Sequence, residues 1–123
     1  MKALLYVMLG GGLGSGLRFL VSKVLNTNGQ LPWGTFAVNV LGSLLIGFLM
    51  GWAAKNNSLN SSQLLFLATG FCGGFTTFSA FAIEGHALFK AEDFWGMAIY
   101  IIGSLVVGVL AVFLGLWLAK TQL

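Results

Sequence analysis

The residues best suited to chemistry lie between positions 70 and 84, where an apolar segment carries the sequence GFCGGFTTFSAFAIE. This stretch combines three glycines, three hydroxyl side chains, four phenylalanines and one carboxylate. Lipid offers no hydrogen-bond partners to a backbone, so an irregular chain at membrane depth persists only where protein buries it or a wet cavity meets it. Polar groups in such a segment are usually functional. We therefore take residues 70–84 as the primary candidate site.

Two phenylalanines of this stretch stand at helical spacing. Phe78 and Phe81 are three residues apart and share one helical face, beyond the break in the helix that we expect at Gly73 and Gly74. Aromatic rings carry a positive edge and a negative face. Edges turned toward a path could therefore contact a dehydrated anion without binding it too tightly. Ordinary packing is the alternative interpretation.

A second apolar segment carries polar side chains on one face. Thr35, Asn39 and Ser43 recur at intervals of four residues, which places them along the same side of a helix. Asn39 should lie near the middle of the bilayer, where its amide needs partners. It either joins two helices by hydrogen bonds or donates its NH₂ group to a passing anion.

The remaining candidates are single polar groups in other apolar segments. Tyr100 and Ser104 are four residues apart and form either a ladder of hydroxyl donors or ordinary interhelical hydrogen bonds. Glu84 is the one carboxylate inside any predicted span; protonated or hydrogen-bonded, it could hold a water molecule or orient a donor. Arg18 either extends to the lipid headgroups or draws anions toward a vestibule.

No catalytic constellation accompanies these groups. The sequence has one cysteine and one histidine, and it offers no carboxylate dyad and no phosphate-binding loop. The glycine-rich run at 10–14 lies inside an apolar segment and follows no strand, so it does not indicate a dinucleotide site. We expect a protein that is not an enzyme.

Composition defines the elements that must position these residues. The 123-residue chain is 58% hydrophobic and 7% charged, with a mean hydropathy of +0.94. A soluble domain of this size could not bury so much apolar surface. We predict an all-α membrane protein, one domain over residues 1–123, with four transmembrane helices. The expected spans are 3–24, 34–54, 62–88 and 94–119, joined by loops at 26–32, 55–62 and 90–93.

The basic residues show no bias between the two sides of the predicted bundle. One side carries Lys2, Lys55 and Lys120, and the other carries Lys23, Lys90 and Arg18. Orientation normally follows an excess of Lys and Arg in cytoplasmic loops. An even count predicts insertion both ways up, and hence an antiparallel, dual-topology homodimer; a single topology set by other features is the alternative. With so few charges, nucleic acid is not an expected partner.

Three motifs in chain order resemble the small bacterial fluoride channels called Fluc or CrcB. They are GGLGSGLR at 11–18, GTFAVNVLGS at 34–43 and GFCGGFTTFSAF at 70–81. The resemblance implies passive, selective efflux of fluoride across the bacterial inner membrane by a multi-pass protein, which protects the cell from fluoride toxicity. It also implies a dual-topology homodimer with two antiparallel pores.

The resemblance assigns roles to individual residues. It implies that Phe78 and Phe81 line the pore, that Asn39 reaches a fluoride position and that Arg18 serves the vestibule. It implies a central sodium ion held by the carbonyls of Gly73 and Thr76 from both subunits. The further pore residues that it implies are Thr35, Ser79, Glu84, Tyr100 and Ser104. Many relatives carry a hydroxyl residue where this chain has Ala80, and some carry one at Gly108. The predicted row of hydroxyl donors along the path, which we call the hydroxyl track, therefore has fewer members in this chain.

Two other functions share some of these features. A small multidrug-type exporter also has four spans and dual topology, but it needs an ionisable proton-exchanging group in its first helix, where this chain has only Arg18. A membrane scaffold would conduct no ions at all. Fluoride flux from liposomes would identify the channel, tight binding of a lipophilic cation would favour the exporter, and a scaffold would show no ion flux.

Overall fold

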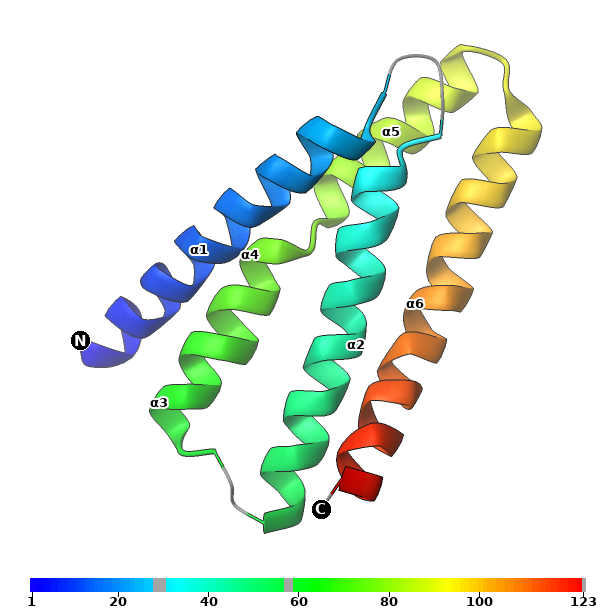
Figure 1. The fold of residues 1–123 in the computed structure, drawn as a ribbon. Helices are drawn as coiled ribbons and strands as arrows, with labels where there is room; N and C mark the ends of the chain where they lie inside the picture. The colour runs from blue at the N-terminus through cyan, green and yellow to red at the C-terminus, as the bar shows by residue number, and fades with distance from the viewer. Residues whose placement is uncertain (28–30, 57–58, 123) are drawn as a thin grey trace.

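The computed structural model describes residues 1–27, 31–56 and 59–122 (Figure 1). Over these residues the chain is built from helices, which are α1 (Lys2–Leu25), α2 (Trp33–Asn56), α3 (Ser61–Leu64), η1 (Leu65–Cys72), α4 (Gly73–Phe75), α5 (Phe78–Lys90) and α6 (Phe94–Gln122). The segments from α3 to α5 form one apolar stretch. Four stretches are long and apolar enough to cross a membrane, which confirms the four predicted spans. Residues 28–30 of the first predicted loop and 57–58 of the second lie outside the described residues.

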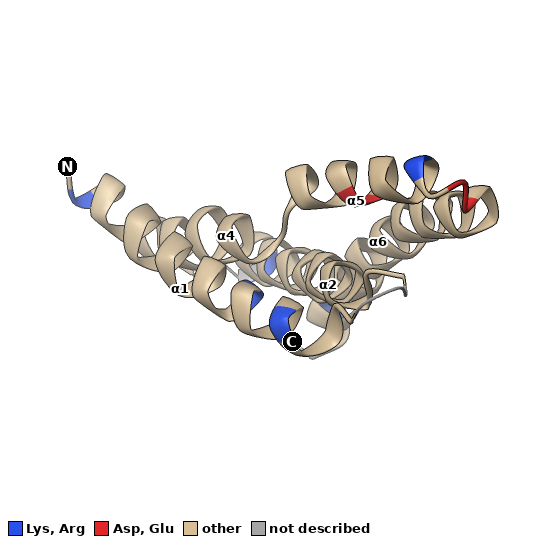
Figure 2. Cartoon of the chain, turned by 90° about the horizontal axis from the view of Figure 1, so that it is seen from above, with Lys and Arg blue, Asp and Glu red and all other residues tan. Residues whose placement is uncertain are grey.

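Charged residues mark the ends of these helices. Figure 2 shows how few there are along the bundle. Each lysine lies within three residues of a helix end, and Glu92 and Asp93 lie in the turn before α6. Arg18 and Glu84 are the exceptions, because both lie well inside helices. These two charges therefore need polar partners within the protein, and the site described below provides them.

Local capping explains where the third segment begins and where α6 starts. Asn60 caps α3 through a reciprocal pair of bonds, in which its side chain accepts from the Gln63 amide at 2.8 Å and its own amide donates to Gln63 Oε1 at 3.0 Å. Asp93 Oδ1 accepts from the Gly96 amide at 2.9 Å and caps α6 in the same way.

Glycines allow the helices to approach closely in two pairs. α1 packs on η1 and α4, where a Cβ on Gly10 or Gly14 would meet the carbonyl oxygen of Phe66 or Phe71. α2 packs most extensively on α6, and there Gly47 lies against the backbone of Val112. Small residues at such contacts permit close packing of backbones where lipid gives no hydrophobic driving force. The two pairs together form the bundle.

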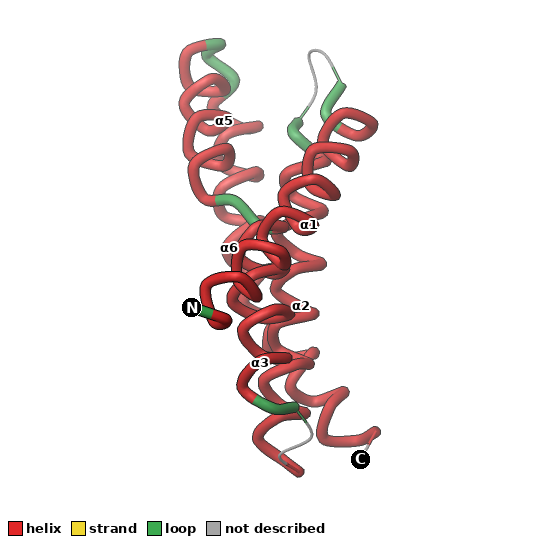
Figure 3. Tube along the Cα trace, turned by 90° about the vertical axis from the view of Figure 1, so that its left-hand side faces the viewer, coloured by secondary structure: helices red, strands yellow, loops and turns green. Residues whose placement is uncertain are grey.

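The third segment is interrupted between α4 and α5. Thr76 (φ −89°, ψ 158°) and Thr77 (φ −150°, ψ 124°) are extended, and α5 begins at Phe78. We expected the break at Gly73 and Gly74, but both are helical here, so that position was wrong by two to three residues. The reason is that Asn39 of α2 pairs with the Thr77 backbone, while the Thr77 hydroxyl caps α5 by accepting from the Ala80 amide at 3.1 Å. Beyond the interruption α5 diverges from α1 (Figure 3).

Candidate functional site

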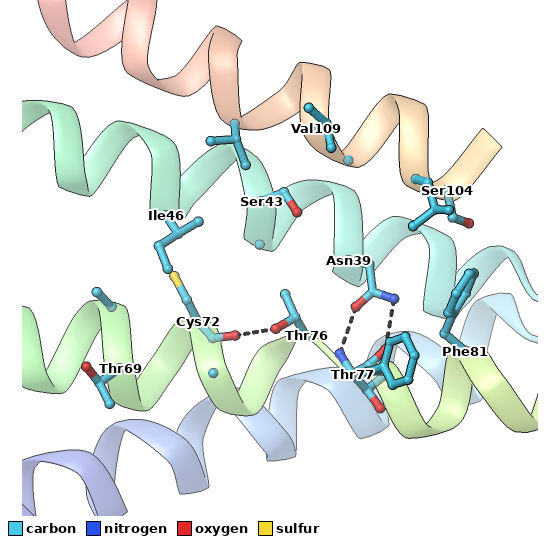
Figure 4. Close-up of a pocket in the computed structure, with 17 residues that line it drawn as sticks. Asn39, Ser43, Ile46, Thr69, Cys72, Thr76, Thr77, Phe81, Ser104 and Val109 are labelled. Carbon is cyan, nitrogen blue, oxygen red and sulfur yellow. Dashed lines mark hydrogen bonds between the residues drawn. The ribbon is translucent and has the colours of Figure 1, made fainter. Parts of the chain in front are cut away.

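A groove of about 610 Å³ runs beside the interruption, between α2, α6 and the third segment (Figure 4). Much of its wall is apolar, with Ile46, Val109 and Val112 among the lining residues. Six of the residues predicted to form the site also line it, namely Asn39, Gly73, Thr76, Phe78, Phe81 and Ser104. The structure therefore brings most of the candidates from three separate segments to one concave surface.

Asn39 pairs with the extended backbone at the interruption. Its Nδ2 donates to the Thr77 carbonyl oxygen at 3.0 Å, and its Oδ1 accepts from the Thr77 amide at 2.7 Å (Figure 4). The side chain thus replaces the helical partners that Thr77 lacks. A carboxamide has two N–H groups, and this pair uses one of them. The second N–H group of Asn39 is not used in this pair, and the Asn39 side chain lines the groove.

Among the described residues, backbone carbonyls at the interruption lack hydrogen-bond donors, and those of Gly73 and Thr76 belong to residues that line the groove. Thr76 donates both its amide and its hydroxyl to the Cys72 carbonyl oxygen, at 3.0 and 2.8 Å. Within the described residues, the carbonyl oxygens of Gly73 and Thr76 accept no hydrogen bond from a turn, a loop or a side chain. Unpaired carbonyl oxygens on a groove wall suit a hard cation, which prefers oxygen ligands.

The two phenylalanines differ in exposure. The side chain of Phe78 is 77% exposed, whereas Phe81 is partly buried; their ring centroids are 6.0 Å apart at an angle of 50°. Phe81 also lies 5.2 Å from the Tyr100 ring, so it stands between the groove and the polar cluster described next. Ser79 is exposed, and its Oγ is 3.4 Å from the Thr77 hydroxyl.

Three predicted residues, Thr35, Glu84 and Tyr100, form a second group together with Asn26, and we call these four residues the Glu84 cluster. The Thr35 hydroxyl donates to Glu84 Oε2 and the Tyr100 hydroxyl donates to Glu84 Oε1, both at 2.8 Å. Thr35 is 1% and Tyr100 is 4% exposed. The carboxylate of α5 is thereby held by donors from α2 and α6. Hydrogen bonds to an ionised acceptor are among the strongest in proteins.

The predicted hydroxyl track is divided between the groove and the Glu84 cluster. Ser104 lies one turn from Tyr100 on α6 but lines the groove and does not bond to Glu84. Its buried Oγ has no hydrogen-bond partner within the described part of the chain. Buried hydroxyls normally find a partner, so this one is available to a group that enters the groove.

Asn26 is the member of the Glu84 cluster that sequence reasoning missed. Its Nδ2 lies 3.3 Å from both Glu84 Oε2 and Thr35 Oγ1. We had assigned Asn26 to the first loop, and it follows the last residue of α1. An asparagine beside a helix end is a capping signal. No pattern in the sequence, however, indicates its contact with a carboxylate 58 positions away.

Arg18 joins α1 to the end of α4. Its Nε donates to the Gly74 carbonyl oxygen at 2.9 Å, and Ser15 Oγ donates to the same oxygen at 3.4 Å. A cation beside the last carbonyls of a helix is favourable because these carry partial negative charge. Arg18 is partly buried and does not line the groove. Its predicted vestibule role is not tested by this geometry.

These features define a multi-pass α-helical membrane protein with a groove at mid-bundle. A family model described as CrcB-like protein, Camphor Resistance (CrcB) matches residues 5–116, and the chain belongs to this family. It is 45% identical to the fluoride-specific ion channel FluC of Phocaeicola vulgatus, over 98% of this chain and 100% of the relative. It is 46% identical to the FluC of Novosphingobium aromaticivorans, over 94% of each. The FluC of Flavobacterium psychrophilum is 43% identical over 98% of each.

Proposed function

We propose that this protein is a fluoride-selective channel that mediates passive fluoride efflux across the bacterial inner membrane. The observation that carries the proposal is similarity over nearly the full chain to relatives named fluoride-specific ion channels. Those names do not favour the multidrug exporter. The groove supports the proposal independently, because aromatic edges and isolated donors suit a small, strongly hydrated anion.

The groove residues supply the chemistry that selectivity needs. Fluoride enters cells as a neutral weak acid and ionises in the more alkaline cytoplasm, after which a potential negative inside drives the anion out. The pore must replace the hydration shell and still release the ion. The unused N–H of Asn39 and the unpartnered Ser104 hydroxyl are donors on the wall, and Phe78 and Phe81 provide ring edges. Thr35, Glu84, Tyr100, Ser79 and Arg18 complete the proposed pathway.

The working unit that we propose is an antiparallel homodimer with two pores. The even count of basic residues permits insertion in both orientations. The groove is open on a single copy, and Phe78 is mostly exposed. A second copy related by a two-fold axis in the membrane plane would cover this surface. Cross-linking of single-cysteine variants in membranes tests the arrangement.

We also propose a sodium ion at the interruption. The residues suit such an ion, because Gly73 and Thr76 line the groove and, within the described residues, their carbonyl oxygens accept no hydrogen bond from a turn, a loop or a side chain. Two carbonyls from each copy would give four oxygen ligands on the dimer axis. A bound cation there satisfies the free carbonyls and holds the interruption in place. In the proposed function it is structural and takes no part in moving the anion.

Fluoride efflux from liposomes tests the function. Purified protein is reconstituted with potassium fluoride inside, and valinomycin sets the membrane potential. We expect release of fluoride but not of an equal internal concentration of chloride. Equal chloride release contradicts selectivity, and no release contradicts the channel. Replacing sodium with N-methylglucamine during purification and assay tests the cation separately.

A further inference from the structure

We infer that Asn26 is a positioning residue that orients Glu84 and Thr35 for fluoride transport. The inference rests on the proposed function, because it concerns the same pathway. Asn26 lies outside every element predicted to carry the site, directly after α1. It nevertheless contacts the one carboxylate that lies inside a span.

The orientation of the Asn26 amide follows from its backbone partners. Its Oδ1 accepts from the Gly34 amide at 2.7 Å and is 3.4 Å from the Thr35 amide. These N–H groups belong to the first turn of α2, where helical amides lack partners of their own. Only an oxygen can accept from them, so the NH₂ group must point the other way. It then meets Glu84 Oε2 and Thr35 Oγ1.

The contacts around Glu84 Oε2 form a closed set. Thr35 Oγ1 donates to this oxygen at 2.8 Å and accepts from Asn26 Nδ2 at 3.3 Å, while Asn26 Nδ2 also reaches the oxygen directly. The Thr35 hydroxyl has one proton to donate. Because the Asn26 NH₂ group donates to a lone pair of Thr35 Oγ1, that proton points toward Glu84 Oε2. Asn26 thus determines which way the Thr35 hydroxyl points. One amide joins the end of α1, the start of α2 and the middle of α5.

Gly34 makes room for this arrangement. A Cβ on Gly34 would lie 2.8 Å from Asn26 Oδ1 and 2.8 Å from the Ser22 Cα. A side chain at position 34 would therefore displace the Asn26 amide from the first turn of α2. The glycine and the asparagine act as one unit that brings an NH₂ group to Glu84.

The exchange Asn26→Asp separates positioning from capping. Aspartate keeps an acceptor for the α2 amides and caps helices as well as asparagine does, but it has no NH₂ group to donate. We expect fluoride efflux to fall about tenfold, as loss of one well-placed hydrogen bond allows, and the melting temperature to fall as well, because two carboxyl groups then face each other. Asn60→Asp is the matched control, because Asn60 caps α3 through its Oδ1 far from Glu84. It should leave efflux unchanged.

The outcomes distinguish this inference from the proposed function. Absence of fluoride release by the wild-type protein contradicts the proposed function. If the wild type transports and Asn26→Asp transports equally well, Asn26 is a helix cap and the positioning role is overturned. The same holds if Asn60→Asp lowers efflux by the same factor.

A double variant covers the case in which the two facing carboxyl groups prevent folding. In Asn26→Asp combined with Glu84→Gln, the glutamine NH₂ can donate to the introduced aspartate, which reverses the direction of the hydrogen bond. We expect the melting temperature of the double variant to recover toward the wild-type value. Asn60→Asp combined with Glu84→Gln should show no such coupling. No recovery in the first pair would overturn the contact on which the inference depends.

Discussion

The groove beside the interruption and the Glu84 cluster satisfy their polar atoms in opposite ways. In the cluster, side chains from three helices and the end of α1 bond to one another, and Thr35 is 1% exposed. At the groove a side chain, Asn39, pairs with backbone, and the Ser104 hydroxyl has no hydrogen-bond partner in the part of the chain that the structure describes. Phe78 is 77% exposed there.

The difference indicates where a ligand is needed. The cluster is complete within one chain, since both oxygens of Glu84 already accept hydrogen bonds. The groove differs, because within the described residues the Ser104 hydroxyl has no hydrogen-bond partner and the Gly73 and Thr76 carbonyls accept no bond from a turn, a loop or a side chain. Buried polar groups without partners destabilise a fold. We therefore expect ions and a second copy at the groove, and orientation of donors at the cluster.

The largest effect is expected from Asn39→Ala. This change leaves the Thr77 amide and carbonyl without partners, at roughly 1–3 kcal/mol each, so unfolding should become easier by about 3 kcal/mol and fluoride efflux should be lost. Thermal unfolding in detergent and liposome efflux measure the two results. Asn60→Ala, which removes only a helix cap, should lower stability by about 1 kcal/mol and leave efflux intact. If the two changes had equal effects, the interruption would not depend specifically on Asn39.

Phe81→Ile should abolish fluoride current with little change in stability. The aromatic ring that lines the groove is lost, whereas exchange of one large hydrophobic side chain for another typically changes stability by less than about 1.5 kcal/mol. Single-channel or whole-liposome current measures the effect. Phe113→Ile on the outer face of α6 is the control, because Phe113 is 64% exposed and lies outside the groove. Current that survives Phe81→Ile would place the anion path elsewhere.

Thr35→Val should lower both stability and transport to an intermediate degree. The valine keeps the shape but removes the donor to Glu84 Oε2, a charge-assisted bond worth about 2 kcal/mol. We expect efflux to fall about tenfold because the carboxylate loses its orientation. The melting temperature and efflux rate should fall together. A normal melting temperature would show that the cluster is not a closed network.

The smallest effect on stability is expected from Ser104→Ala. The Ser104 hydroxyl has no partner within the described residues, so its removal should leave stability unchanged or raise it by up to about 1 kcal/mol. Efflux should fall about threefold, because a groove donor is lost. Comparison with Thr35→Val separates the two regions: one hydroxyl supports the fold, and the other serves the groove. A clear loss of stability in Ser104→Ala would remove that distinction.

The sequence by itself determined the class of protein and pointed to several of the residues that line the groove or bond to Glu84. Its apolar composition required four spans, because no soluble core of this size could hide them. Helical spacing placed Phe78 and Phe81 on one face, and both line the groove. All these signals are local, so a linear pattern is enough to reveal them.

Only the tertiary structure decided the partners of the polar groups. The break fell at Thr76 and Thr77 because Asn39, from another helix, pairs with Thr77. The predicted hydroxyl track is divided because the Thr35 and Tyr100 hydroxyls donate to Glu84, whereas Ser104 lines the groove. Asn26 joined the cluster from what seemed to be a loop. Hydrogen bonds depend on atoms within about 3 Å of each other, and only the packed helices bring residues so distant in sequence to that range.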